Sequence, residues 1–442
     1  MIKEDVVDKS AEILKKYSLC DSCLGRQFAL LGSGLTNRER GRAIKIILLM
    51  KAFSLSGLRD EELLRVLCES GFKPALKLVS KYGIQIKYEK KPCYLCNNFF
   101  EEKNLDEWVR KILDKIDGIE FETFQVGCRL DLSLLAREED LRTLFKLEYG
   151  ESIKTEINRE IGRRICENTG KRHSIKSPDI LIIVDLTAND VILEIKPLYI
   201  YGRYRKLTRG IPQNIWFCPR CRGRGCEKCG GTGRLYLESI EEYISLPLME
   251  TTEGTGYKFH GAGREDVDVR TLGSGRPFVV EIKNPRKRKI NLNEVIKRIN
   301  EEAAGKVEVL MLEFSDKKTV RHIKKLAEIS AKTYRALVKF EGTVSLEKLK
   351  ELEEFFKNRA ISQRTPRRVL HRRPDKVRRK TIFDVKAKRI TSDTVEFTIK
   401  CQGGLYVKEL ITGDEGRTKP NFSDFLGLKV ESITLDVMGV ED

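Results

Sequence analysis

Apolar residues recur at helical spacing through the first part of the chain. Residues 6–20 and 38–57 place apolar side chains three and four positions apart, with charged residues between them. This is the pattern of an amphipathic helix, whose apolar positions fall on one face. The sequence therefore predicts a helical region from residue 1 to about residue 115.

The pattern changes near residue 120. Residues 119–131 and 179–202 are rich in β-branched and other apolar residues, and the second stretch predicts two strands joined by a turn at 188–190. Between these stretches, residues 150–170 have the spacing of an amphipathic helix that ends at Gly170. The order predicts a small α/β unit over residues 116–212.

The last two hundred residues mix both periods. Ser239 and Glu242 have the spacing of a capping box, so we expect a helix to begin there. A glycine-rich loop, residues 261–277, follows, and strands then alternate with helices before the chain ends in strands. The expected strands are 278–282, 307–314, 333–342, 380–390, 393–400 and 429–437, and the expected helices are 319–330 and 345–359. This pattern predicts an α+β domain with a large mixed sheet.

Charge and composition narrow the classes of function. The chain has 442 residues and a formal net charge of +18, and it lacks the long apolar run of a signal peptide or membrane helix. We therefore expect a cytoplasmic protein without membrane contact. The basic residues cluster at 364–380, 283–289 and 199–209, the last interleaved with tyrosines. Such clusters favour a nucleic-acid partner over a merely solvated surface, because phosphates pair with cations and bases stack on aromatic rings.

Eight of the twelve cysteines form four CxxC pairs. A CxxC turn directs two thiolates at one ion, so two turns complete a tetrahedral, closed zinc site. Disulfides or a redox CxxC are the alternative, which a cytosolic location disfavours. The expected ligands are Cys20, Cys23, Cys93 and Cys96 for a first structural zinc, and Cys218, Cys221, Cys226 and Cys229 for a second.

The glycine-rich loop carries more charge than a turn needs. Asp266 and Asp268 lie between Arg264, Arg270 and Arg276, and neighbouring guanidiniums favour the ionised form of a carboxyl group. An ionised Asp can coordinate metal, act as a base or attack carbon as a nucleophile. The alternative without chemistry is a polar turn tied by Arg–Asp pairs. A dinucleotide-binding loop fits poorly, because the third glycine and the strand–loop–helix context are missing.

Two resemblances give these residues a function. The α/β unit, which ends in GRYRKLTRG, resembles a THUMP domain, an RNA-binding module of RNA-modifying enzymes. The stretch GREDVDVRTLGSGRPF closely resembles the active-site motif of the archaeal and eukaryotic tRNA pseudouridine synthases of the Pus-ten family. AKTYRALV, QRTPRRVLHRR and GGLYVKELITGDEGRTKPNFSDFLG resemble further blocks of that family, and the likeness covers nearly the whole chain.

The resemblance implies roles for individual residues. Asp266 would be the nucleophile, attacking the target nucleoside at the base or at the ribose carbon. Tyr334 would pack on the flipped base and help remove the proton from carbon five. Lys408 takes the place of a basic residue that pairs with the aspartate and is often Arg in relatives. Leu410 would line the uracil pocket, and Arg264 would enter the base stack or contact phosphate.

We therefore expect a monomeric α+β enzyme that converts uridines 54 and 55 in the T-arm loop of tRNA to pseudouridine, with structural zinc and no organic cofactor. The expected catalytic domain, residues 239–442, has the pseudouridine synthase fold. The expected accessory domain, residues 1–238, comprises a helical zinc part (1–115), a THUMP-like part (116–212) and a zinc knuckle (213–238). A non-catalytic, zinc-stabilised RNA-binding protein is one alternative. Another THUMP enzyme, a methyltransferase or thiolase, is the second, but the sequence shows no loop for a nucleotide or methyl donor.

Overall fold

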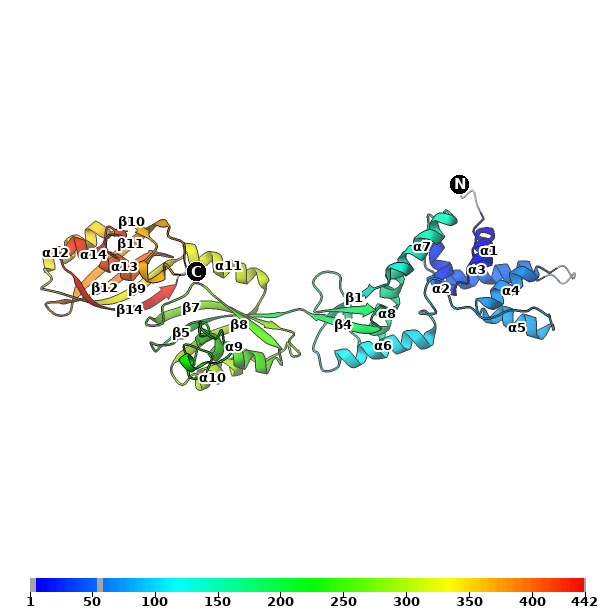
Figure 1. Ribbon diagram of the computed structural model, residues 1–442, viewed down its shortest axis with the longest axis horizontal. Coiled ribbons are helices and arrows are strands. Elements are labelled where there is room, and N and C mark those ends of the chain that lie inside the picture. Colours follow the sequence, from blue (N-terminus) through cyan, green and yellow to red (C-terminus); the bar gives the residue numbers. More distant parts are fainter. Residues whose placement is uncertain (1–4, 54–58, 372, 441–442) are drawn as a thin grey trace. The chain divides into compact units, whose positions relative to one another are not determined.

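The computed structural model divides into two compact units, Met1–Lys196 and Pro197–Asp442 (Figure 1). It describes residues 5–53, 59–371 and 373–440. The end of the helical stretch expected at 38–57 therefore lies partly outside the described residues. Among the helices that are described, none combines the length and apolarity that crossing a membrane requires.

The first part of the N-terminal unit is helical, as predicted. Its helices share one hydrophobic core, to which Leu48, Leu67 and Ile112 contribute fully buried side chains. A side-chain cap begins several of these helices; Thr36 and Glu39, for example, form a capping box at the start of α3. The helices are α1 (Val6–Lys16), α2 (Asp21–Gly25), α3 (Asn37–Ala52), α4 (Glu61–Glu69), α5 (Lys73–Lys81) and α6 (Glu102–Ile116).

A four-stranded sheet follows in the order β2-β1-β3-β4. Strands β3 and β4 form the predicted hairpin around residues 186–189, and β3 runs parallel to β1. Helix α8 packs on β1 and ends at Gly170, whose φ of 68° is the left-handed conformation that glycine favours at a helix end. The elements are β1 (Thr123–Arg129), α7 (Leu132–Leu144), α8 (Ile153–Thr169), β2 (Arg172–His173), β3 (Ile180–Asp185) and β4 (Asp190–Ile195).

The C-terminal unit is built on one large mixed sheet of ten strands. Nine of them follow the order β13-β10-β11-β12-β9-β14-β7-β5-β8, and β6 pairs with β7. The strands are β5 (Leu198–Lys206), β6 (Gly256–Gly261), β7 (Arg270–Lys283), β8 (Val307–Ser315), β9 (Ala331–Phe340), β10 (Arg359–Arg364), β11 (Val377–Arg389), β12 (Thr394–Gln402), β13 (Thr418–Lys419) and β14 (Val430–Val440).

Helices cover this sheet in two groups. Helices α9 and α10 pack with β5, β7 and β8 around one core, and α11 contributes to a smaller core with Val279 of β7. The other half of the sheet is covered by α12, α13 and α14. Helix α9 begins at the predicted cap, Ser239, whose hydroxyl accepts the Glu242 N–H. The helices are α9 (Ile240–Thr251), α10 (Leu292–Glu302), α11 (Lys317–Ile329), α12 (Leu346–Phe356), α13 (Val407–Thr412) and α14 (Phe422–Leu426).

The two halves of the sheet join at a short seam. Strand β7 has β5 along one edge, and along the other edge it pairs with β14 only at Arg270 and Thr271. On that same edge β6 pairs with β7 from Phe278 onward. The edge is therefore open between the two pairings. Gly273 lies at the seam with a φ of 57°, where a Cβ atom would lie 1.8 Å from the Met438 carbonyl oxygen.

The boundary between the units differs from the predicted one at residue 238. Strand β5 was expected in the THUMP-like part, but it pairs with β7 and with the edge strand β8 in the ten-stranded sheet of the C-terminal unit. The second cysteine cluster also belongs to the C-terminal unit. The reason is that Lys196 and Pro197 end the hairpin of β3 and β4, so the next strand is free to enter another sheet.

Candidate active site

The aspartate loop, residues 262–269, joins β6 to β7 at the open edge of the sheet. Neighbouring side chains of this loop point in different directions. Arg264 is exposed, Glu265 is buried, and Asp266 is 32% exposed. A carboxylate held partly exposed beside the seam can reach a ligand, whereas a fully buried one cannot.

Glu265 anchors the loop in the core. Its carboxylate lies 2.8 Å from Nε of Arg276 and accepts a hydrogen bond of 2.9 Å from the Tyr204 hydroxyl. Gln213 donates in turn to the Tyr204 oxygen and to the Gly263 carbonyl. All four side chains are buried, so each polar group depends on the others for its partner. This network fixes the residue directly before Asp266.

Lys206 of β5 holds the backbone of the loop. Its buried ammonium donates to the carbonyl oxygens of Asp266 and Val267, at 3.3 and 2.7 Å. Burial lowers the pKa of Lys206 to about 8, although Glu265 and the two aspartates of the loop favour its charged form. The basic and aromatic run 199–209 is therefore largely internal, and its tyrosine Tyr204 is a core residue rather than a surface for stacking bases.

Asp266 is paired with an arginine that the sequence analysis did not single out. Nη1 of Arg368 donates to Oδ2 of Asp266 at 2.7 Å. Lys408, the expected partner, has its Nζ 3.9 Å from the same oxygen and forms its short contact, 2.6 Å, with Asp268. Although partial burial opposes ionisation, Lys408 keeps the pKa of Asp268 below its ordinary value. Arg368 is thus the direct cationic partner of Asp266, and Lys408 is that of Asp268.

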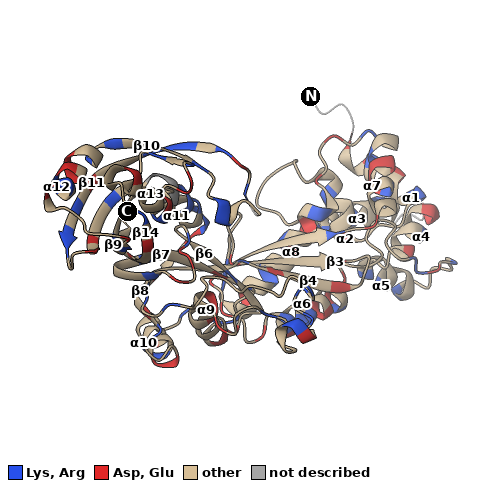
Figure 2. Ribbon diagram, turned by 60° about the vertical axis from the view of Figure 1, so that its left-hand side comes forward, with Lys and Arg blue, Asp and Glu red and all other residues tan. Residues whose placement is uncertain are grey.

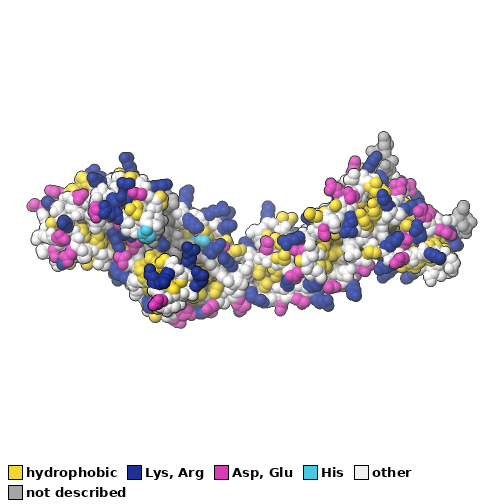
Figure 3. Space-filling view, viewed as in Figure 1, with side chains coloured by type: hydrophobic (Ala, Val, Ile, Leu, Met, Phe, Trp, Pro, Cys, Tyr) yellow, Lys and Arg dark blue, Asp and Glu magenta, His cyan; other side chains and the backbone are white. Residues whose placement is uncertain are grey.

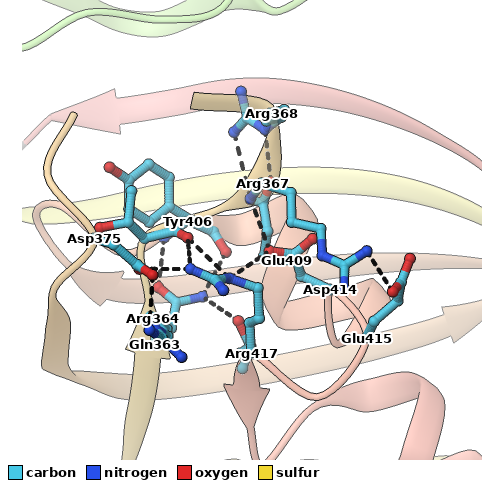
Figure 4. Close-up of polar contacts among 12 residues, drawn as sticks. Gln363, Arg364, Arg367, Arg368, Asp375, Tyr406, Glu409, Asp414, Glu415 and Arg417 are labelled. Carbon is cyan, nitrogen blue, oxygen red and sulfur yellow. Dashed lines mark hydrogen bonds and ion pairs between the residues drawn. The ribbon is translucent and has the colours of Figure 1, made fainter. Parts of the chain in front are cut away.

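Arg368 is itself held by Glu409, which lies on α13 (Figure 4). Nε of Arg368 lies 2.6 Å from the Glu409 carboxylate, so the guanidinium bridges two acids. Burial disfavours the charged form of Arg368, but the two carboxylates outweigh it and raise its pKa. The arginine is therefore a fixed cation beside Asp266.

Much of the basic run 364–380 is paired with acids in the same way. Figure 4 shows the ion pairs of Arg364 and Arg417 with Asp375, and the ion pair of Arg367 with Glu415. Arg373 donates to the Tyr406 hydroxyl at 3.0 Å; Arg372 lies outside the described residues. The run is thus a folded segment between β10 and β11 rather than a loose basic arm.

A cavity of about 920 Å³ opens at Asp266. Its size suits a small organic ligand such as a nucleoside. Apolar side chains from α13, β14 and three connecting segments make up one part of the lining, and basic side chains, called the basic rim below, make up another. The apolar lining consists of Val269, Val369, Leu405, Val407, Leu435 and Val437, and the basic lining includes Arg264, Lys332, Arg373, Arg378, Arg379 and Lys380.

Tyr334 and Lys332 line the same cavity from β9. They lie two residues apart on one strand and so share a face of the sheet. Burial raises the pKa of Tyr334 well above its ordinary value, and Cys401 and Asp266 add to this effect. Burial, together with Arg276 and Lys380, lowers the pKa of Lys332 to about 8. The cavity thus contains a neutral phenol and an easily deprotonated lysine.

Two further predicted residues differ in their surroundings. Arg264 lines the cavity, with its guanidinium carbon 4.9 Å from the centre of the Trp216 ring. Leu410 is fully buried in the core and is not among the residues that line the cavity. Leu410 is two residues after Lys408 on α13, which is about 200° around a helix, so a lysine facing the cavity turns Leu410 toward the core.

The cysteines form the two predicted tetrads. Within each tetrad the four Sγ atoms lie within 4.8 Å of one another. Individual separations are 3.6 Å for Cys20 and Cys96, and 3.8 Å for Cys218 and Cys226. Four sulfurs at a Zn–S distance of about 2.3 Å in a tetrahedron would be about 3.8 Å apart. The tetrads therefore fit a tetrahedral metal ion, and all twelve cysteines are free thiols rather than disulfides.

Backbone amides also point at the sulfurs. The N–H of Cys23 donates to Sγ of Cys20 at 3.4 Å, and in the second tetrad the N–H of Gly233 donates to Sγ of Cys229 at 3.2 Å. Hydrogen bonds to a thiolate favour the charged, metal-binding form. Both tetrads consist of four sulfurs, so a metal bound there would have no open position for catalysis.

Basic side chains extend the cavity rim across the C-terminal unit. Figure 2 shows basic segments along the hairpin of β10 and β11, and the space-filling view shows Lys and Arg side chains gathered on the face that it draws of this unit (Figure 3). Arg378, Arg379 and Lys380 at the cavity belong to β11. A polyanion lying across the cavity would meet these charges.

Comparisons with known proteins cover both units. The model for the Pus10 C-terminal domain matches residues 199–441, and the model for the archaeal Pus10 THUMP domain matches residues 108–185. The chain is 47% identical to the tRNA pseudouridine synthase Pus10 of Thermofilum pendens, over 97% of this chain and 94% of that protein. It is 42% identical to the Pus10 of Methanothrix thermoacetophila, over 99% and 95%. Among solved structures, a crystal structure of a Cbf5–Nop10–Gar1 complex matches 54% of this chain and 49% of that one, with a TM-score of 0.31 and 15% identity.

Proposed function

Because this chain belongs to the Pus10 family of tRNA pseudouridine synthases, we propose that it isomerises uridines 54 and 55 in the T-arm loop of tRNA, with Asp266 as the nucleophile. The observation that carries the proposal is the position of Asp266. Its carboxylate lies at a cavity large enough for a nucleoside and is paired at 2.7 Å with a fixed arginine.

The reaction conserves every atom of the nucleoside. The bond between N1 of uracil and C1′ of ribose breaks, the base turns, and C5 forms the new bond to C1′. C5 loses a proton and N1 gains one. The target uridine must first leave its stack, because the reacting atoms are out of reach within it. The wall of Leu405, Val407 and Leu435 is suited to an extruded base, and an ionised Asp266 is suited to attack on carbon.

Arg368 and Lys408 would keep Asp266 ionised and in place. An adjacent cation favours a carboxylate over the carboxylic acid, and only a carboxylate is a nucleophile. Arg368 supplies the direct contact, and its own link to Glu409 limits its movement. Lys408, with its Nζ 3.9 Å from the same oxygen of Asp266, would add a second positive charge nearby.

Tyr334 would pack against the extruded base. Because burial raises its pKa, its hydroxyl stays protonated at neutral pH and is a poor base. We therefore assign it stacking on the base and a hydrogen bond to a water molecule that accepts the C5 proton, rather than direct removal of that proton. Arg264, exposed at the cavity edge, would take the space of the extruded base or contact a phosphate. Leu410 contributes from the core, by supporting α13.

We propose zinc as the metal of both tetrads. Four thiolates with separations of 3.6 to 3.8 Å fit this ion. In the first tetrad, bound zinc would cross-link segments that lie far apart in sequence, such as those of Cys20 and Cys96. In neither tetrad would it take part in the isomerisation. Asp266 itself would form the covalent intermediate and the reaction has no net oxidation, so we infer that it uses no organic cofactor.

The basic rim would hold the tRNA backbone, and the THUMP domain of the N-terminal unit would add contacts to the rest of the tRNA. Because its substrate is tRNA, we infer that the enzyme acts in the cytoplasm. We also infer that it acts as a monomer. Analytical ultracentrifugation of the protein with and without tRNA tests the last point, since a monomer predicts one chain in both species.

Mapping pseudouridine in an unmodified tRNA transcript after incubation with the protein tests the proposed function. We expect conversion at positions 54 and 55 only. Transcripts with cytidine at one of the two positions separate the two events. Absence of pseudouridine at both positions, with a protein that binds the transcript, would refute the proposal.

A further inference from the structure

A second cavity, of about 510 Å³, adjoins the first at Asp266. Asp266, Arg368 and Lys408 line both cavities, so a ligand in one lies next to a ligand in the other. The remaining lining of the second cavity is Arg209, Gly210, Trp216, Tyr236, Val267, Asp268 and His371. The mechanism above makes no use of the aromatic pair in this lining.

Trp216 and Tyr236 are held together by the hairpin of the second tetrad. Their ring centres are 5.5 Å apart at 78°, an edge-to-face contact. The Trp216 carbonyl accepts a hydrogen bond of 2.8 Å from the Leu235 N–H. In the next pair of the same hairpin, the Cys218 N–H donates to the Gly233 carbonyl. A metal ion bound by Cys218 and its three partners would therefore close the hairpin that positions both rings.

The cations of the second cavity are already neutralised. Arg209 pairs with Asp436 at 2.5 Å, Lys408 with Asp268 at 2.6 Å, and Arg368 with Asp266 and Glu409. The carboxylate of Asp268 is 64% exposed and faces the cavity. Because these three cations are paired with acids, they attract phosphate little, and the exposed carboxylate of Asp268 can still accept hydrogen bonds from N–H groups. An aromatic wall beside such an acceptor suits a planar, neutral group with N–H donors.

We propose that the second cavity binds the nucleobase next to the target uridine, which stacks on the Trp216–Tyr236 pair while the uridine occupies the first cavity. This assignment rests on the proposed function. A strand that extrudes one base leaves its neighbour without a stacking partner, and the aromatic pair replaces that partner. Arg264 lies 4.9 Å from the Trp216 ring, so the same indole also orients the residue at the mouth of the first cavity.

A binding cycle between enzyme and RNA tests this subsite. T-arm stem–loop RNAs carry either the natural nucleotide or an abasic residue at the position 5′ or 3′ of the target uridine. Dissociation constants are measured by fluorescence anisotropy in an Asp266→Asn background, which leaves the RNA unconverted. The proteins compared are this background alone and with Trp216→Ala, Trp216→Phe or Leu237→Ala. Leu237 is 72% exposed on the same hairpin and outside both cavities, so it is the matched control.

Stacking of one base on an aromatic ring predicts a loss of about tenfold in affinity when either partner is removed. At one of the two positions, the abasic RNA should bind about tenfold more weakly than natural RNA to the Asp266→Asn protein and to its Leu237→Ala form. The Trp216→Ala form should bind the two RNAs with equal affinity. Trp216→Phe should restore most of the difference. If abasic residues at both positions cost the same with and without Trp216, the subsite is refuted.

Two measurements separate this result from other failures. Metal content at the second tetrad in the Trp216→Ala protein shows whether the hairpin is intact, and the abasic RNAs test the subsite on a protein with native Trp216. If the wild-type protein forms no pseudouridine but the binding cycle shows coupling at Trp216, the proposed function fails and the base-binding site stands.

Discussion

Glu265 and Asp266 are neighbours in sequence with opposite surroundings. Glu265 lies in the core with Arg276 and Tyr204, and Asp266 faces the cavity with Arg368. The buried acid fixes the backbone, and the partly exposed acid is left for chemistry. Residues 261–277 include four glycines, and such a segment needs an anchor, because glycine leaves the backbone many conformations.

Replacing Glu265 with Gln tests this anchor. Arg276 would keep its charge in a buried site without a counter-charge, which is strongly unfavourable. We expect the free energy of unfolding to fall by about 3 kcal/mol, measured by urea denaturation. Glu308→Gln removes a carboxylate from an exposed pair with Arg205, and this control should cost less than about 1 kcal/mol. Equal losses from the two changes would contradict the anchor.

Arg368 carries the second prediction at this scale. Arg368→Ala removes the cation that contacts Asp266, so kcat for pseudouridine formation should fall about 100-fold. The neighbouring Arg367 pairs with an exposed Glu415 instead, and Arg367→Ala should change kcat by less than about threefold. An unchanged kcat in Arg368→Ala would contradict this role of Arg368 and leave Lys408 as the cation that keeps Asp266 ionised.

Part of the site was predictable from local sequence and part was not. The cysteine tetrads follow from CxxC spacing, because the chemistry of the ligands requires it. Arg368 was not singled out, because all nine basic residues of the run 364–380 have the same local pattern and only the fold brings one of them to Asp266. The position of Leu410 depended on which face of α13 meets the core, and six residues are too few to show a helical period.

At the scale of elements, the seam between β7 and β14 positions the cavity. Asp436 of β14 pairs with Arg270 of β7 at 2.9 Å and with Arg335 of β9 at 3.1 Å, and Arg209 joins them after β5. Four segments of the chain therefore meet at one buried carboxylate. Although burial opposes its ionisation, the guanidiniums hold the pKa of Asp436 below its ordinary value of 3.8.

Asp436→Asn should therefore weaken the seam in a pH-dependent way. We expect a loss of about 2 kcal/mol in the free energy of unfolding at pH 7, because the arginines keep their charges without the carboxylate. A lowered pKa stabilises the folded state above the unfolded pKa, and this stabilisation disappears as pH falls through the folded pKa. The difference between wild type and Asp436→Asn should thus shrink below about pH 4, as measured by denaturation between pH 3 and 7. A constant difference would show that the charge of Asp436 contributes nothing.

The elements themselves were largely predictable, and strand β5 shows why one was misassigned. The end of α8 at Gly170 and the start of α9 at Ser239 follow from local capping chemistry, and both are confirmed. In β5, tyrosines interleaved with basic residues indicated a surface for nucleic acid. The basic side chains instead bind backbone carbonyls, as Arg203 does with Ser274, and such long-range contacts leave no local pattern in the sequence.

At the scale of the whole chain, the two tetrads lie in different units, so a metal ion in each would stabilise a different part of the protein. The first joins segments about seventy residues apart in the N-terminal unit, whereas the second closes a short hairpin in the C-terminal unit. Their loss should therefore have different effects. Binding energy for structural zinc adds directly to folding, since the unfolded chain has no formed site.

Metal analysis checks this expectation. The wild-type protein should contain two zinc ions per chain, and Cys93→Ser and Cys226→Ser should each contain one. Cys93→Ser should lower the thermal stability more, since its site crosses a whole helical region. Cys128→Ser, a change at a free cysteine outside both tetrads, should keep both ions. Two ions in either tetrad variant would contradict the assignment.

The most direct test of the central claim compares Asp266→Asn with the wild-type protein on unmodified tRNA. Asn has nearly the shape of Asp but is no nucleophile at carbon. Asp316→Asn makes the same change at the cap of α11, where Asn is also a good cap. Mapping of the tRNA should find pseudouridine at positions 54 and 55 with the wild-type and Asp316→Asn proteins and none with Asp266→Asn. Pseudouridine formed by Asp266→Asn at the wild-type rate would contradict the account.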